Sequence, residues 1–183
     1  METSNDKKVK KGDGESLFSW IRTLLIYVLI ALFFRFFIFN ITVVDGESML
    51  PTLHDGDKLI TEKISLYFKN INKGDIVVVH APDRSGQNYI KRVIGMAGDH
   101  VEIVDAKLYI NGELQNEDYI NGKDTFAYTD VTSWDIKEGQ VFVLGDNRNA
   151  SNDSRSFGPI DIGEVVGISV LRIFPLSGIG TLK

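Results

Sequence analysis

The chain has 183 residues, of which 43% are hydrophobic and 25% are charged, a balance typical of a folded protein. It contains no cysteine, which excludes disulfides, thiolate nucleophiles and cysteine metal sites. Residues 1–44 carry six Lys and Arg against four Asp and Glu, net +2, whereas the remaining residues carry 14 basic and 21 acidic side chains, net −7. Because the larger part is acidic, we expect no nucleic-acid partner.

One hydrophobic segment, residues 17–39, follows a polar stretch, residues 1–16, which we expect to be a disordered tail. The segment contains two charges, Arg22 and Arg35, separated by twelve uncharged residues. As a helix its 23 residues would reach roughly 34 Å, against about 30 Å for the hydrocarbon core of a bilayer. Both arginines lie near the ends, where their side chains can reach the headgroups. We therefore predict a transmembrane helix over residues 17–39.

Two other interpretations of this segment are weaker. A buried helix of a soluble domain would normally present a polar face, which this segment lacks. A cleaved signal peptide would also follow a basic stretch, but the sequence after Phe39, "NITVVDGESM", offers no small-x-small cleavage site. The pattern favours an anchor that is retained.

The charges that flank the segment predict its orientation. Five cations lie on its N-terminal side: Lys7, Lys8, Lys10, Lys11 and Arg22. Arg35 and Lys58 are the first cations on the other side. Because cytoplasmic flanks carry the excess of Lys and Arg, we place the N-terminus in the cytoplasm and residues 40–183 outside, beside the membrane phospholipid.

Beyond the anchor, short runs rich in Val and Ile alternate with turn residues, which is typical of β-strands. The runs cover residues 57–64, 75–81, 88–96, 100–112, 140–146 and 164–174. Asn111-Gly112 lies between two apolar runs and predicts a two-residue hairpin. Only residues 61–75 leave room for a helical turn or two. We expect a mainly β domain over residues 40–183.

Residues 100–139 include the least regular part of this domain. Its second half, residues 115–139, shows no sustained hydrophobic period. We expect a loop-rich insertion or small subdomain at about residues 100–139.

A serine lies just beyond the anchor, in "GESMLPTL". Ser48 stands between Gly46 and Pro51, which favour a tight turn. A serine becomes a nucleophile when a base lies beside it, whereas serine in such a turn is often structural. The sequence differs from the G-x-S-x-G elbow because its fifth residue is Leu50. The octet alone leaves both interpretations open.

Histidine is one candidate for the base. The chain has three, His54, His80 and His100. Catalytic triads occur in different chain orders, so a triad stays open. Nothing around these histidines marks one of them as the base.

Lys91 is the stronger candidate, in "NYIKRVIGM". Strand alternation places it on the same face as Tyr89 and Val93. If this face is buried, desolvation lowers the lysine pKa, and a neutral amine could take the proton of Ser48. If it is exposed, Lys91 and Arg92 are an ordinary solvated pair.

A third segment, "GDNRNASNDSRSFG", is dense in polar turn-forming residues. A polar loop would explain it. The alternation of charge suggests an internal pair between Asp153 and Arg155. No register fits a calcium-binding loop, so we expect no metal site here.

Taken together, these segments resemble those of type I signal peptidases (leader peptidases, serine peptidase family S26), the membrane-bound endopeptidases that remove signal peptides from exported proteins. "SMLPT" is similar to the nucleophile box of that family, "YIKRVIGMAGD" to its lysine box and "GQVFVLGDNRNASNDSRSFG" to its C-terminal box, in the expected order. The resemblance runs from the anchor through at least Gly158. It implies an antiparallel β-sheet catalytic domain of signal-peptidase/LexA-like type, with a small inserted subdomain and one N-terminal transmembrane helix.

The resemblance also implies roles for individual residues. Ser48 matches the nucleophile, Lys91 the general base and Ser151 the serine that orients the lysine amine. Four residues match structural positions near the site: Arg92, Asp146, Asp153 and Arg155. The backbone N–H of Ser48 would bind the oxyanion, and Gly46 occupies the position where some members have a second, hydroxyl donor. With a glycine at this position, the sequence resembles those of the shorter Gram-positive-type enzymes.

The implied activity is a Ser-Lys endopeptidase of the bacterial cytoplasmic membrane, acting through an acyl-enzyme on secreted preproteins, with no cofactor and no metal. One alternative is a self-cleaving regulatory protease of the LexA type, which the hydrophobic anchor and the lack of a DNA-binding segment disfavour. Another is a non-catalytic anchored β module that binds a partner, which would leave the three boxes without a use.

Overall fold

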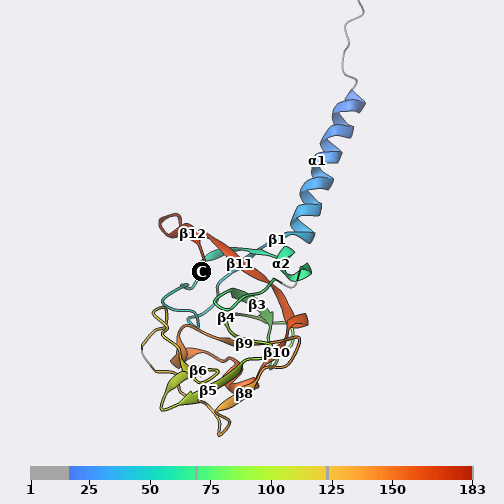
Figure 1. Cartoon of the computed structure of the whole chain (residues 1–183). Coiled ribbons are helices and arrows are strands. Elements are labelled where there is room, and N and C mark those ends of the chain that lie inside the picture. Colours follow the sequence, from blue (N-terminus) through green and yellow to red (C-terminus); the bar gives the residue numbers. More distant parts are fainter. Residues whose placement is uncertain (1–16, 69, 123, 183) are drawn as a thin grey trace, which may run out of the picture.

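The structure, a computed structural model, describes residues 17–68, 70–122 and 124–182; the predicted tail over residues 1–16 lies outside them. Helix α1 (Leu17–Phe37) extends away from a β domain (Figure 1). The helix was predicted to run to Phe39, but it ends at Phe37, because Phe39 is already the first residue of strand β1. Among the described residues, α1 is the one helix long and apolar enough to cross a membrane, with a mean hydropathy of 2.1 over Leu17–Arg35.

The larger sheet is antiparallel throughout, with the strand order β1-β2-β11-β3-β4-β9-β10 and β12 paired to β11. Its strands are β1 (Phe39–Val43), β2 (Lys58–Glu62), β3 (Ile76–His80), β4 (Asn88–Met96), β9 (Gln140–Leu144), β10 (Ile160–Asp161), β11 (Val165–Phe174) and β12 (Gly180–Thr181). Five of these strands lie within runs that the sequence predicted, namely β2, β3, β4, β9 and β11. Sequence reasoning missed β1, since its residues continue the apolar segment before it.

A second, smaller sheet is built from residues 100–135. Its order is β7-β6-β5-β8, from strands β5 (His100–Val104), β6 (Lys107–Ile110), β7 (Glu113–Leu114) and β8 (Ser133–Asp135). The predicted hairpin is confirmed, with φ of 54° at Asn111 and 80° at Gly112. The run 100–112 proved to hold two strands, joined at Asp105 and Ala106, both with positive φ. Alanine rarely adopts this conformation, so the sequence did not predict the turn.

Strands β4 and β9 are buried on both faces. On one face Val93 packs with Val77 and Val143 in the core of the larger sheet. On the other face Ile94 and Phe142 pack against the smaller sheet. A side chain on either strand can therefore be removed from water.

Short helices complete the fold. They are α2 (Ile64–Tyr67), α3 (Ser154–Phe157) and the 3-10 turns η1 (Arg148–Ala150), η2 (Ile162–Glu164) and η3 (Leu176–Gly178). Helix α2 lies in the segment predicted to hold a helical turn. Helix α3 starts where the Asp153 side chain accepts a hydrogen bond from the Arg155 N–H, as an N-cap does. The predicted fold class is confirmed: the protein is mainly antiparallel β, preceded by an apolar helix.

Candidate active site

The structure brings Ser48 and Lys91 together from positions 43 residues apart. Ser48 lies in the turn between β1 and β2, and Lys91 lies on β4. The Lys91 Nζ donates a hydrogen bond of 2.9 Å to the Ser48 Oγ. Both residues line a cavity of about 190 Å³ between residues 42–45 and 88–91. A nucleophile and a base within hydrogen-bond distance, open to a cavity, are the arrangement that nucleophilic catalysis requires.

Lys91 is buried, with 2% of its surface exposed. It shares a face of β4 with Tyr89, whose ring centroid lies 5.1 Å from the Nζ, and with Val93. Burial lowers the Lys91 pKa to about 8; the Asp153 charge opposes this shift and the Arg155 charge adds to it. The interpretation of an exposed pair with Arg92 is therefore wrong.

Ser48 is held by a turn with buried anchors. Met49 and Leu53 pack in a core beneath the turn, and the Leu53 N–H donates to the Met49 carbonyl at 2.9 Å. Gly46 has a φ of 96°, which L side chains rarely adopt. Its N–H donates to Asp55 Oδ1 at 2.8 Å. The glycine is explained by the backbone conformation that starts the turn.

Asn147 fixes the backbone on both sides of the Ser48 side chain. Its N–H donates to the Ser48 carbonyl at 3.0 Å, and its side-chain amide donates to the Glu47 carbonyl at 3.1 Å. Sequence reasoning gave Asn147 no role, although it directly follows Asp146 in the C-terminal box. The Ser48 N–H has no hydrogen-bond partner among the residues described. A backbone N–H without a partner is a type of donor that can bind an oxyanion.

Asp146 links the strand of the lysine to the turn of the serine. Arg92, next to Lys91 on β4, donates to both carboxylate oxygens of Asp146, at 2.9 and 2.7 Å. Thr52, on the Ser48 turn, donates its hydroxyl to the same carboxylate. Arg92 and Asp146 are 2% and 0% exposed, so the fork of two hydrogen bonds replaces their lost hydration. Thr52 was not predicted, because only the folded chain brings it to Asp146.

The Asp153–Arg155 pair is also present and fully buried. The guanidinium donates to the two carboxylate oxygens at 2.8 Å each, and both side chains are 0% exposed. Asp153 additionally accepts from the Gly145 N–H at 3.1 Å. The pair therefore fixes the end of β9.

Ser151 lies next to the dyad, but its expected hydrogen bond to the Lys91 amine is not formed in this structure. Its Oγ is buried and has no hydrogen-bond partner in the part of the chain that the structure describes. It packs against Gly145, where an added Cβ would lie 2.3 Å from the Ser151 Oγ and 2.5 Å from the Ser48 carbonyl oxygen. Gly145 thus lies beside Ser48 and Ser151, although the sequence indicated no role for it.

Comparison with known proteins gives one consistent result. A family model described as signal peptidase, peptidase S26, matches residues 17–174. Signal peptidase I of Bacillus licheniformis is 40% identical over 186 residues, which cover 97% of this chain and 96% of the relative. Signal peptidase I T of Bacillus subtilis (strain 168) is 35% identical over 184 residues, with 96% and 95% covered.

Two further similarities agree in name. Signal peptidase IB of Staphylococcus aureus (strain N315) is 36% identical over 178 residues, which cover 89% of this chain and 92% of the relative. A crystal structure of a signal peptidase I from Enterococcus faecalis V583 is 38% identical and covers 54% of this chain and 95% of that chain, with a TM-score of 0.46.

Proposed function

The chain belongs to the signal peptidase family, peptidase S26, and on this premise we propose that it removes signal peptides from exported preproteins as a Ser-Lys endopeptidase. The observation that carries the assignment of residues is the 2.9 Å hydrogen bond between Lys91 Nζ and Ser48 Oγ. The burial of Lys91 supports it, because a lysine with a lowered pKa can act as a general base near neutral pH.

The proposed reaction is acyl transfer in two steps. The neutral Lys91 amine takes the proton of Ser48 as its Oγ attacks the scissile carbonyl, and the Ser48 N–H donates to the oxyanion. The Lys91 ammonium then gives its proton to the leaving amine, so that the peptide bond breaks and an ester to Ser48 remains. A water molecule, deprotonated by Lys91, hydrolyses the ester and restores the enzyme.

The proposed substrate lies as an extended strand beside β1. Strand β1 forms the edge of the larger sheet, so one side of its backbone is open to an added strand. Residues 42–45 at the end of β1 line the cavity that also contains Ser48. A volume of about 190 Å³ suits the small residues that family substrates carry at the first and third positions before the cut.

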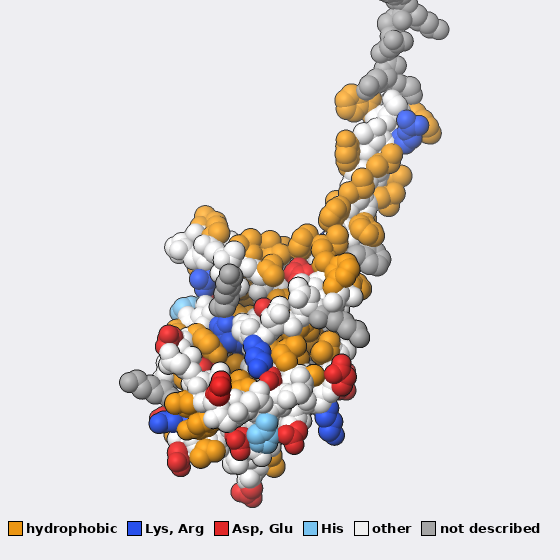
Figure 2. All heavy atoms as spheres, in the orientation of Figure 1, with side chains coloured by type: hydrophobic (Ala, Val, Ile, Leu, Met, Phe, Trp, Pro, Cys, Tyr) orange, Lys and Arg blue, Asp and Glu red, His pale blue; other side chains and the backbone are white. Residues whose placement is uncertain are grey.

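Membrane anchoring by α1 is part of the proposal. Figure 2 shows hydrophobic side chains along α1 and over the end of the β domain where α1 joins it. Exposed members near this end are Phe39, Ile41, Val43, Leu176 and Ile179. An apolar end facing the bilayer would hold the Ser48 cavity close to the outer leaflet. The flanking cations favour a cytoplasmic N-terminus and an extracytoplasmic catalytic domain in a bacterial cell.

The proposed function predicts a single cut in a preprotein. We expect the purified full-length chain in detergent micelles to release a mature protein whose new N-terminus follows a small-x-small sequence, mapped by mass spectrometry. A matched preprotein with phenylalanine at the first position before the cut should resist cleavage, because the cavity is small. Cleavage only of an inactive copy of this chain would favour the self-cleaving alternative, and binding without cleavage would favour the non-catalytic module.

A pH profile tests the role of the lysine. Only the neutral amine accepts a proton, so kcat/KM should rise with pH through about 8, the pKa of Lys91, and fall about tenfold per unit below it.

If the Ser151 hydroxyl turns to the amine during the reaction, Ser151→Ala should lower kcat/KM and move this acid limb. An unchanged rate and limb in Ser151→Ala would separate Ser151 from the base. Loss of the limb only in His54→Ala, His80→Ala or His100→Ala would point to a histidine base.

A further inference from the structure

Residues 115–128, here named the covering loop, contain no helix or strand among their described members, which exclude Lys123. The sequence predicted only that this region is irregular. In the fold the loop lies against the end of β9, where the Asn121 N–H donates to the Asp146 carbonyl at 3.0 Å. It also contacts three buried arginines of the active-site scaffold.

The first contact is between Tyr119 and Arg92. The Tyr119 ring lies 4.1 Å from the guanidinium carbon of Arg92, a distance at which a cation is attracted to the face of a ring. The Tyr119 hydroxyl donates to Glu117 at 2.6 Å. Since Arg92 follows Lys91 on β4 and pairs with Asp146, the loop covers the ion pair that joins the two halves of the dyad.

The second contact is between Glu117 and Arg148. Two guanidinium nitrogens of Arg148 donate to the two carboxylate oxygens of Glu117, at 2.6 and 2.8 Å. Thr125 accepts a further bond from the same guanidinium. The Arg148 Nε donates to the Gly145 carbonyl at 3.0 Å. Arg148 is 0% exposed, and Glu117 is the one carboxylate paired with it among the residues described.

The third contact is between Tyr128 and Arg155. The ring centroid of Tyr128 lies 4.1 Å from the guanidinium carbon, and the Arg155 guanidinium also donates to the Phe126 carbonyl at 3.1 Å. The Tyr128 hydroxyl donates to the Arg148 carbonyl. The loop thus contacts each of the three arginines that are buried around the dyad.

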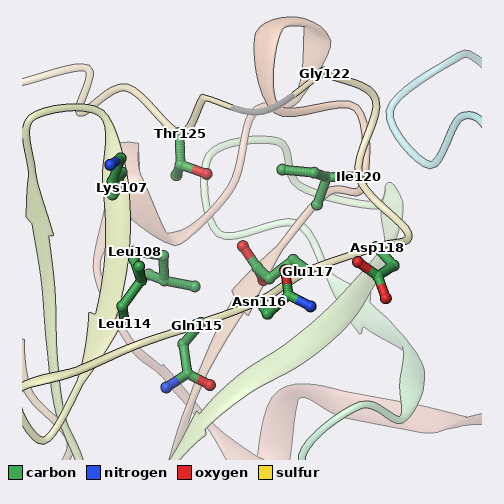
Figure 3. A pocket seen from close by; sticks show the side chains of 10 residues that line it. All are labelled: Lys107, Leu108, Leu114, Gln115, Asn116, Glu117, Asp118, Ile120, Gly122 and Thr125. Carbon is green, nitrogen blue, oxygen red and sulfur yellow. The ribbon is translucent and has the colours of Figure 1, made fainter.

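The loop is also attached to the smaller sheet, by backbone hydrogen bonds from the Gln115 N–H to the Leu108 carbonyl at 2.9 Å and from the Thr125 N–H to the Ala106 carbonyl at 2.7 Å, and Ala127 packs against the core there. Figure 3 shows Glu117 and Thr125 on the wall of a cavity of about 500 Å³, which also reaches Leu108 and Leu114 of the smaller sheet. Between these attachments the cavity leaves Glu117 without packed neighbours from β6 and β7 on that side. The charge-assisted bonds to Arg148 and the ring contact with Arg92 are the contacts that join the loop to the scaffold of Ser48 and Lys91.

We propose that the covering loop positions the catalytic dyad, with Glu117 and Tyr119 as positioning residues. Glu117 holds Arg148, and through it the Gly145 carbonyl; Gly145 approaches the Ser48 turn so closely that an added Cβ would lie 2.5 Å from the Ser48 carbonyl oxygen. Tyr119 holds Arg92, and through it Asp146, which binds the Ser48 turn by way of Thr52. This inference rests on the proposed Ser48–Lys91 function and adds to it a role for the insertion.

The charges around the base give this role a measurable consequence. Asp146, Asp153 and Arg155 act on Lys91 from the end of β9 and from α3, while burial is the main reason that the Lys91 pKa is low. A loosened loop admits water to these groups, so burial weakens and the Lys91 pKa rises. The acid limb of kcat/KM then moves to higher pH, which a uniform loss of folded protein would not cause.

The experiment compares matched variants of the full-length chain in detergent micelles, with preprotein as substrate. Tyr119→Leu removes the ring, whereas Tyr119→Phe keeps it and removes only the hydroxyl. Glu117→Gln removes the carboxylate paired with Arg148, whereas Asp118→Asn removes an exposed carboxylate next to it. We expect Tyr119→Leu and Glu117→Gln to lower kcat at least about tenfold, with KM within about twofold of wild type and the acid limb at higher pH. Tyr119→Phe should lose less than Tyr119→Leu, and Asp118→Asn should match wild type.

The outcomes distinguish failure of the proposed function from failure of the positioning role. A wild-type chain that cleaves no preprotein would overturn the proposed function itself. A cleaving wild type, with wild-type kcat and acid limb in both Tyr119→Leu and Glu117→Gln, would overturn the positioning role alone. Circular dichroism checks the fold of each variant. If one of Tyr119→Leu and Glu117→Gln unfolds, the other decides by its pH profile: an acid limb moved to higher pH supports the role, and an unmoved limb with unchanged kcat refutes it.

Discussion

Replacement of Lys91 by alanine, or of Ser48 by alanine, is expected to lower kcat for preprotein cleavage by about 10⁴- to 10⁶-fold. In the proposed mechanism the two side chains, joined by a 2.9 Å hydrogen bond, act as one unit: without the amine the hydroxyl keeps its proton, and without the hydroxyl the amine has no nucleophile to activate. The double variant should therefore be no slower than either single variant. Single-turnover cleavage, followed by gel or mass spectrometry, measures all three.

Controls for this prediction must keep the fold. Lys91→Met retains an unbranched apolar stem in the buried position and should be as inactive as Lys91→Ala. Lys137→Ala removes an exposed lysine away from the cavity and should be fully active. Cleavage by Lys91→Ala at near the wild-type rate would defeat the assignment of the base and return attention to the three histidines.

Gly145→Ala is expected to lower kcat by about 100-fold and to cost about 1–3 kcal/mol of stability. The added methyl would lie 2.5 Å from the Ser48 carbonyl oxygen and 2.3 Å from the Ser151 Oγ. Rotation of the Ser151 hydroxyl would not relieve the contact, because the Ser151 Cβ would also lie 2.5 Å from the methyl, and the carbonyl belongs to the backbone of Ser48, which must move with it. A shift of that backbone separates Ser48 from Lys91 and from the position of the oxyanion.

Gly163→Ala is the matched control, because an added Cβ there meets nothing within 4 Å and no positive φ opposes it. Its kcat and melting temperature should equal those of wild type. If Gly145→Ala keeps wild-type kcat, then the Ser48 turn tolerates displacement, and the geometry described for the site is not what sets the rate.

Much of the fold could be predicted from local patterns. The apolar segment predicted α1, the Val- and Ile-rich runs predicted the long strands, and Asn111-Gly112 predicted the hairpin that the structure contains. The misses have local causes as well. Strand β1 continues the apolar composition of α1, and β8 has only three residues, too few to display alternation.

Less of the site could be predicted. The three boxes pointed to Ser48, Lys91 and the partners of the ion pairs, because each box carries its residues in one short stretch. Asn147 and Gly145 lie in the same stretch, but no pattern indicated their roles. Hydrogen bonds to the backbone, and the close approach of Gly145 to Ser48 and Ser151, do not change the composition of the segment. Glu117 and Tyr119 lay in a segment without periodicity, where sequence reasoning predicted only a loop.

Composition and local sequence were enough to predict α1, most of the longer strands, the absence of cysteine chemistry and the set of reactive residues, because these depend on neighbours along the chain. Which of these residues lie side by side depends on how the whole chain folds. Strand alternation put Lys91, Tyr89 and Val93 on one face, but whether that face is in water depends on the strands on either side and on the turn that carries Ser48. Burial, and with it the lowered pKa of Lys91, arises from segments far apart in sequence. For this reason a lysine that is ordinarily exposed becomes, in this fold, a candidate base.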